Sequence, residues 1–302
     1  DVLGSRGLGD VYKRQFQIKA GQPVCIVTYV SGSLEDDARL PEAYDKLSSV
    51  NGPQLALLKI EKKQWWKDMW TRSYVETNDS LLNRQYLSSI YLMASACNLH
   101  SPVCGGMYGV WNMNDSMNYH GDIHLNYNSQ AGFYSVFSAN RPELAMPYYD
   151  FLEKLIPEGK RRAREEMGLV HPSLKDKSCR GLLFSVSALG NGYLYGEYWQ
   201  QTMDAPFNIP LFSWYYEYTG DREFLRKRAY PFIRECGDFY EDYLEKETLD
   251  STYRYNILTG GHEGSWDLNP PSDLAFVEQT FRLLLRYSEI LGVDENRRAL
   301  WK

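Results

Sequence analysis

The chain has 302 residues, a formal net charge of −6 and a pI near 5.5. This acidic balance argues against a nucleic-acid partner, which requires a basic face, and no run of apolar residues is long enough to cross a membrane. The five cysteines are scattered without a C-x-x-C pair, so we expect neither a disulfide framework nor a zinc site, and no cofactor.

Aromatic side chains are unusually frequent: 24 Tyr, 12 Phe and 8 Trp make up 15% of the residues. Rings with polar edges suit surfaces that stack on the faces of sugars while offering hydrogen bonds. Large helical cores collect the same residues. Composition alone therefore suggests a carbohydrate ligand without establishing one.

The first 33 residues differ in composition and hydrophobic pattern from the rest. Residues 1–15 are glycine-rich, show no hydrophobic period and end in a stretch that resembles translated sequencing-adapter read-through, so we expect a non-native segment there. The β-branched run from Val24 to Val30 lies between two glycine-containing turns and predicts a strand. Because a lone strand needs partners, we interpret residues 16–33 as the end of an upstream β-domain.

From Leu34 onward the pattern is helical. Apolar residues recur at intervals of three and four in four stretches, each of which predicts an amphipathic helix. These stretches run from Leu82 to Cys97, from Phe133 to Leu155 with a break at Arg141-Pro142, from Phe224 to Tyr243, and from Val277 to Leu291. Thr219-Gly220-Asp221 predicts a helix stop followed by an N-cap. We therefore predict an all-α domain over residues 34–302.

Two long polar segments interrupt the helices. Residues 105–130 include Trp111, and residues 256–273 include Gly260-Gly261-His262-Glu263-Gly264. Loops of this length inside a compact domain are usually functional. We therefore expect a site at one end of a helical bundle.

The first segment carries His124, Asn126 and Asn128 at alternate positions. In an extended segment this spacing places all three side chains on one face. Amides beside an imidazole provide the donors and acceptors needed to bind hydroxyl groups or to hold a water molecule. The alternative is that the asparagines cap turns and the histidine binds a loop carbonyl.

In the second segment Glu263 lies beside His262, Trp266 and Asp267. Desolvation against an aromatic wall raises the pKa of a carboxyl group, which suits a general acid, although an ordinary solvated glutamate is the alternative. We interpret Asp267 as a weaker second carboxylate and Asp273 as the N-cap of the helix that follows. No G-x-S-x-G elbow, H-E-x-x-H motif or phosphate loop occurs, so metal dependence is not expected.

Three motifs resemble, in the right order, those of glycoside hydrolase family 95, the α-L-fucosidase family. They are Trp65-Trp66-Lys67-Asp68-Met69-Trp70-Thr71-Arg72-Ser73, the segment from His120 to Gln130 with its H-x-N-x-N-x-Q pattern, and the segment from Trp214 to Leu225. The resemblance runs from about Trp65 to the end of the sequence. It implies a β-sandwich followed by an (α/α)6 barrel, of which residues 34–302 would form a part.

The resemblance also implies inverting hydrolysis and assigns roles to residues. The glutamate at the position of Glu263 protonates the leaving oxygen, and the asparagines matching Asn126 and Asn128 hold the attacking water for a base aspartate. The histidine matching His124 binds the sugar. Further candidate sugar contacts are Trp111, Glu197, Trp199 and Trp266.

The sequence departs from the family pattern in two places. Where family fucosidases continue Q-M-N-Y-W, it reads Gln130-Ala131-Gly132-Phe133-Tyr134, so a related α-L-sugar or a galactoside is an alternative to fucose. The family's base aspartate lies in a Q-x-D-G-N-F-G-like segment that this sequence lacks. We therefore expect a catalytic domain truncated at its C-terminal end and inactive by itself.

The expected function is that of an exo-glycosidase that acts on an oligosaccharide or polysaccharide. The alternatives are a phosphorylase of related barrel fold and a sugar-binding relative that has lost the chemistry. By analogy with such enzymes, we expect a secreted or periplasmic protein.

Overall fold

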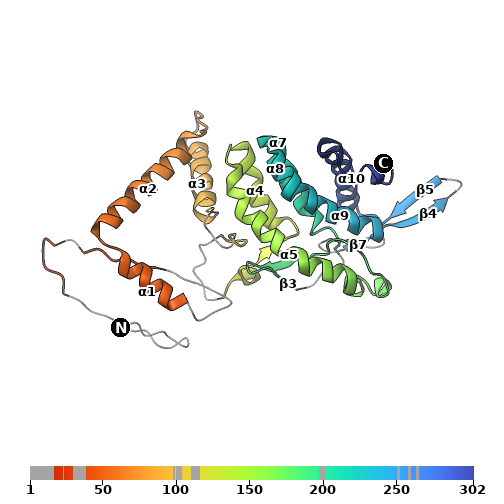
Figure 1. The fold of residues 1–302 in the computed structure, drawn as a ribbon, viewed down its shortest axis with the longest axis horizontal. Helices are drawn as coiled ribbons and strands as arrows, with labels where there is room; N and C mark the ends of the chain where they lie inside the picture. The colour runs from red at the N-terminus through yellow and green to blue at the C-terminus, as the bar shows by residue number, and fades with distance from the viewer. Residues whose placement is uncertain are drawn as a thin grey trace. The chain divides into compact units, whose positions relative to one another are not determined.

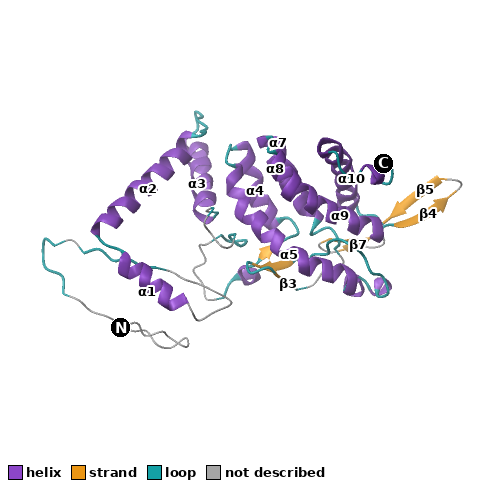
Figure 2. Cartoon of the chain, in the orientation of Figure 1, coloured by secondary structure: helices purple, strands orange, loops and turns teal. Residues whose placement is uncertain are grey.

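The computed structural model describes residues 17–22, 24–29, 39–97, 99, 104–109, 116–196, 201–249, 252–257, 260–262 and 265–302. The chain divides into two compact units, Asp1–Asp68 and Met69–Lys302. Helices make up most of the described residues (Figure 1), and the strands lie in the connections between helices (Figure 2).

The first unit contains α1 (Arg39–Ser49) and most of α2 (Gly52–Thr71). Residues 24–29 are exposed and belong to no helix or strand, so the strand predicted over Val24–Val30 is not formed in the described part of this segment. The physical reason is that a strand is stable only beside a neighbour that accepts its hydrogen bonds. All of the described sheets lie in the second unit.

The second unit is built from helices that largely match the predicted amphipathic stretches. They are α3 (Ser80–Ala96), α4 (Asn128–Ser138), α5 (Met146–Glu165), the short α6 (Met167–Val170), α7 (Ile209–Thr219), α8 (Arg222–Phe224), α9 (Tyr230–Tyr243) and α10 (Pro271–Leu291). A π-helical turn over Leu225–Ala229 joins α8 to α9. The predicted stop is confirmed as well: Gly220 is left-handed with φ 68°, and the Asp221 carboxylate accepts from the amides of Glu223 and Phe224.

Many of the aromatic side chains are buried in the core of the second unit. α4 packs against α7, and α9 packs against α10. Phe212 stacks on Phe232 with ring centroids 4.5 Å apart, and Phe133 stacks on Tyr148 at 4.6 Å. Tyr240 and the other fully buried tyrosines belong to this core. For these rings, packing rather than sugar contact explains the composition.

Long and short connections alternate along the second unit. Residues 139–145 and 220–221 make tight links, whereas residues 97–127, 166–208 and 244–270 make long ones. The first two long connections share one sheet, in which β1 (Ile123–His124) pairs with β2 (Ser187–Leu189) and β2 pairs with β3 (Tyr193–Tyr195), all antiparallel. The third long connection holds two hairpins, β4 (Glu245–Leu249) with β5 (Thr252–Asn256) and β6 (Gly260–His262) with β7 (Ser265–Asp267).

Aromatic contacts join the three long connections at one end of the helices. Tyr127, at the end of the first connection, meets the edge of Phe207 at a centroid distance of 6.3 Å. Phe207, at the end of the second, lies 4.7 Å from Phe276 in the second turn of α10, directly after the third. The three long connections therefore meet at one end of the helices, where the sequence predicts a site.

Arg141 fastens the other end. Its side chain is fully buried, and its guanidinium donates to the carbonyl oxygens of Met69 (2.6 Å), Ser73 (2.9 Å) and Ala139. A buried cation satisfied by several carbonyl dipoles holds together segments that are far apart in sequence. It ties the residues that precede α3 to the link between α4 and α5.

We expect Arg141→Ala to lower the free energy of unfolding by at least about 3 kcal/mol, because it leaves several buried carbonyls without a donor and opens a cavity. Urea denaturation measures this change. The exposed Arg282 serves as the control, since its alanine variant is expected to stay within about 0.5 kcal/mol of the parent. A loss below about 1 kcal/mol for Arg141→Ala would contradict this role.

Candidate active site

The segment that carries His124, Asn126 and Asn128 is not extended throughout. His124 lies in β1 and is buried, Asn126 lies in a turn and is half-buried, and Asn128 is exposed as the first residue of α4. The prediction that alternation puts the three side chains on one face of an extended strand was therefore wrong. The backbone turns at Tyr127, whose φ of 117° ends the strand and starts the helix.

Gln130 fixes this turn. Its side chain is fully buried, its Nε2 donates to the carbonyl of Leu125 at 2.5 Å, and its Oε1 accepts from the amide of Tyr127 at 3.2 Å. Both ends of one amide thus satisfy the backbone that a strand-to-helix turn leaves unpaired. The glutamine of the H-x-N-x-N-x-Q pattern therefore has a structural role: it fixes the backbone on both sides of Asn126.

The same segment stores backbone strain. Tyr119, His120 and Tyr127 have φ of 52°, 55° and 117°, a region that side chains with a Cβ rarely adopt. Such conformations cluster at functional sites, where the surrounding structure holds them in place. Here Tyr119 also packs its ring edge-on against His124 at 5.3 Å.

An aspartate orients His124. The Nδ1 of His124 lies 3.1 Å from Oδ2 of Asp122, and both side chains are buried. The hydroxyl of Tyr195 donates to the same Oδ2 at 3.2 Å, and Ser187 Oγ lies 3.4 Å from Nδ1. Because a carboxylate accepts the Nδ1 proton, the neutral ring carries its lone pair on Nε2, as in other aspartate-held histidines.

The sheet register builds this group. His124 is directly opposite Ser187, and Ser187 is directly opposite Tyr195. Opposite residues in neighbouring strands share a face, so three side chains from distant parts of the chain meet in one row. Asp122 joins them because it precedes His124 by two residues.

Asn126 offers an unused acceptor. Its Oδ1 is buried and, within the described residues, has no hydrogen-bond partner. Buried polar atoms are almost always paired, so an orphaned amide oxygen beside a buried histidine suits a bound water or hydroxyl group.

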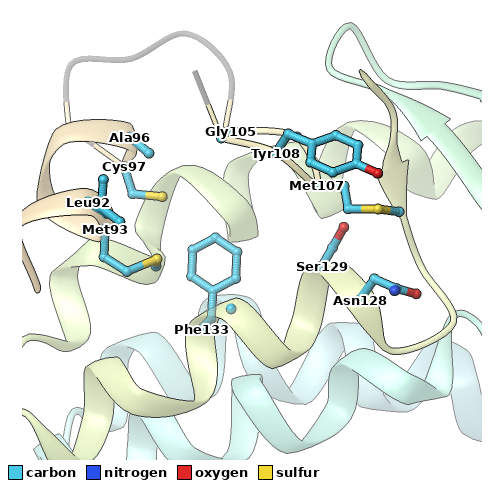
Figure 3. Close-up of a pocket in the computed structure, with 13 residues that line it drawn as sticks. Leu92, Met93, Ala96, Cys97, Gly105, Met107, Tyr108, Asn128, Ser129 and Phe133 are labelled. Atoms are coloured by element: carbon cyan, nitrogen blue, oxygen red, sulfur yellow. The ribbon is translucent and has the colours of Figure 1, made fainter. Parts of the chain in front are cut away.

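Asn128 opens onto a cavity of about 280 Å³ between α3, the turn at residues 104–109 and the first turns of α4. Figure 3 shows Phe133 rising from α4 between Met93 and Tyr108, with the Ser129 hydroxyl directed toward Met107. The turn is tied to the His124 segment, since the amide of Met107 donates to the Asp122 carbonyl at 2.8 Å. The turn that lines the cavity is therefore fixed to the residue that holds His124.

Two buried aspartates lie in the second connection and in the first turn of α10. Asp204 and Asp273 are 0% and 1% exposed, and Thr202 Oγ1 donates to Asp273 at 3.4 Å. Neither oxygen of Asp204 has a hydrogen-bond partner among the described residues. Burial, and then the charge of Asp273, raise the pKa of Asp204 well above its ordinary value. Burial, and then the same aspartate, also raise the pKa of Tyr240.

Asp273 is not the N-cap that the sequence suggested. α10 begins at Pro271, with Pro270 at the cap position, so Asp273 lies within the first turn. Proline is favoured at the first helical positions, where a backbone N–H would have no partner within the helix. Pro271 therefore starts α10 two residues before Asp273.

Comparison with known proteins settles the family. The model of the glycosyl hydrolase family 95 catalytic domain matches residues 44–302. The chain belongs to glycosyl hydrolase family 95.

Two similar proteins bear on this assignment. "Alpha-L-fucosidase 2" from Arabidopsis thaliana is 26% identical over 239 residues, which cover 73% of this chain and 27% of the plant protein. The chain thus spans about a quarter of the length of this relative. A solved structure described as "Putative kojibiose phosphorylase from human microbiome" superposes with a TM-score of 0.59 at 16% identity, covering 87% of this chain and 39% of that one.

The second likeness concerns the fold. At this low identity it shows the architecture alone, and it confirms the predominantly helical fold class, a partial (α/α)6 barrel, expected from the sequence. No described helix combines the length and the apolar character that crossing a bilayer requires.

Several residues predicted for this family 95 site fall outside the described part of the chain: Trp111, Glu197, Trp199 and Glu263. Trp266 and Asp267 are described only as backbone of β7.

Sequence reasoning gave no role to Asp122, Tyr195, Ser187 or Asp204. Asp122 could have been noticed, because it stands two residues before His124 in the quoted motif. The other three carry no local signal, since the sheet register and the packing of α10 bring them to the site.

The raised pKa of Asp204 predicts a pH effect on stability. An unfolded aspartate ionises near about pH 4, whereas the folded one keeps its proton, so stability is present in acid and is lost as pH rises toward the raised pKa. Asp204→Asn removes this loss. Relative to the parent, the free energy of unfolding of the variant is expected to rise by up to about 1.4 kcal/mol per pH unit across this window. Urea denaturation at several pH values above about 5 measures it.

The exposed Asp176 provides the control, because its asparagine variant should follow the parent at every pH. Parallel curves for Asp204→Asn and the parent would show that Asp204 is ionised in the folded protein.

Proposed function

We propose that this chain is part of the catalytic domain of an inverting exo-glycosidase that releases a terminal α-L-fucose or a closely related sugar from glycans or plant polysaccharide, outside the cytoplasm. The observation that carries the proposal is the family 95 match, together with the site at the joined long connections. There, a histidine held by Asp122 lies beside an orphaned Asn126 oxygen and the cavity at Asn128.

In this mechanism Glu263 protonates the glycosidic oxygen, and Asn126 and Asn128 hold the attacking water on the opposite face of the sugar. His124 binds a sugar hydroxyl, its ring fixed by Asp122. Trp111, Glu197, Trp199 and Trp266 are proposed as further sugar contacts. Inversion needs a second carboxylate about 6.5–9.5 Å from the acid. By the family resemblance, this base belongs to a segment that a longer protein would supply.

Glu263→Gln tests the acid role in such a longer protein. We expect kcat/KM on an α-L-fucosyl disaccharide to fall by at least about 100-fold, because the leaving alkoxide loses its proton donor. The loss should be much smaller on a nitrophenyl α-L-fucoside, whose leaving group needs little protonation. Colorimetric and reducing-sugar assays measure both.

Glu278→Gln on the exposed face of α10 is the matched control and should keep full activity. Equal losses on the two substrates would remove Glu263 from the acid role. Turnover that depends on added phosphate would identify a phosphorylase instead.

The stereochemistry gives an independent test. Because the water attacks from the face opposite the leaving group, the first product from an α-L-fucoside is expected to be the β-anomer. Proton NMR recorded before mutarotation distinguishes the anomers. An α-anomer as the initial product would exclude water held by Asn126 and Asn128 as the nucleophile.

A further inference from the structure

The cavity beside Asn128 has an unusual lining for a sugar site. Its thirteen lining residues are Leu92, Met93, Ala96, Cys97, Gly105, Gly106, Met107, Tyr108, Gly109, Asn128, Ser129, Gly132 and Phe133. None of them is acidic, basic or a histidine. Burial raises the pKa of Cys97 to about 11, so its thiol is neutral as well. Because the described lining residues offer no cation to compensate a charge, they favour a neutral occupant over a carboxylate, sulfate or phosphate group.

Gly132 is an exposed residue of α4 at the edge of this cavity. A Cβ built at this position meets no atom within 4 Å, so any larger side chain would project into free space. Its φ is not positive, so the backbone accepts other residues there. Gly132 is one of the positions at which the sequence departs from the Q-M-N-Y-W pattern of family fucosidases.

One polar group within the cavity has no partner. Ser129 is 8% exposed, and its Oγ has no hydrogen-bond partner among the described residues. Figure 3 shows this hydroxyl turned toward Met107, into the space between α4 and the Met107–Tyr108 turn. A buried hydroxyl of this kind calls for an acceptor from a ligand. An occupant thus combines an apolar group, for Phe133 and Met93, with a neutral acceptor, for Ser129.

The position of Asn128 indicates which part of the substrate would lie in the cavity. In inverting hydrolysis the water lies opposite the leaving group, so a space that adjoins the water-holding residue faces the terminal sugar rather than the leaving group. The volume of about 280 Å³ is small for a ligand pocket and far exceeds what a single methyl group fills.

We propose that this cavity binds an O-acetyl group on the terminal sugar, with the acetyl methyl against Phe133 and Met93 and its carbonyl accepting from Ser129. The inference rests on the proposed function, which it extends by naming the substrate class: a neutral, O-acetylated glycoside.

The test compares methyl α-L-fucopyranoside with its mono-O-acetyl derivatives for binding to the 302-residue chain by calorimetry. We expect at least one acetylated derivative to bind about tenfold more tightly than the parent sugar. Gly132→Leu fills the cavity and should abolish this preference while leaving the affinity for the parent sugar unchanged. Leucine is also a better helix former than glycine, so the variant should fold at least as well.

Ser129→Ala should weaken the acetylated ligand about fivefold, the worth of one hydrogen bond, and leave the parent sugar unaffected. Ser135→Leu adds the same bulk to an exposed position of α4 outside the cavity, and it should keep the preference for the acetylated sugar. Equal binding of parent and acetylated sugars, unchanged by Gly132→Leu, would overturn the inference and leave the proposed function standing. Failure of the chain to bind either sugar would overturn the inference, whereas the proposed function is tested separately by the turnover of α-L-fucosides by the longer protein.

Discussion

The candidate site depends on how the chain satisfies its backbone where it leaves one regular element and enters the next. Within a helix the backbone amides and carbonyls pair with each other, but in the turn from β1 to α4 they lack such partners. The Gln130 side chain provides them, donating to Leu125 and accepting from Tyr127. With that brace in place, Tyr127 can hold its positive φ, His124 stays on the sheet, and Asn128 opens the helix beside the cavity.

The alternation of long and short connections gives this turn its surroundings. The links at residues 139–145 and 220–221 are too short to carry a group of functional side chains. The first of them is held in place by the hydrogen bonds of the buried Arg141. The long connections carry the strands, and their sheet and ring contacts bring them together. Stability and function are thereby separated: the aromatic core holds the helices, and the connections hold polar groups that would be costly inside it.

Polar atoms without partners are concentrated in those connections. Asn126, Gln201 and Asp204 each keep a buried oxygen that no described residue satisfies. Most buried polar groups in folded proteins are paired, so a cluster of exceptions is expected where a protein handles water, protons or a ligand. Asp204 differs from the other two, because burial and the charge of Asp273 raise the pKa of its carboxyl group and so favour the neutral form.

The sequence by itself determined the helices and the family motifs, because a hydrophobic period of 3.6 residues and short ordered motifs are local properties. It placed α3, α4, α5, α9 and α10, the Gly220 stop and the two segments that carry the site. It could not show that Asn128 begins a helix or that Pro271 moves Asp273 into the first turn of α10, since turn geometry depends on partners elsewhere. Only the tertiary structure set Tyr195 and Ser187 around Asp122 and His124, because strand register is a relation between distant segments.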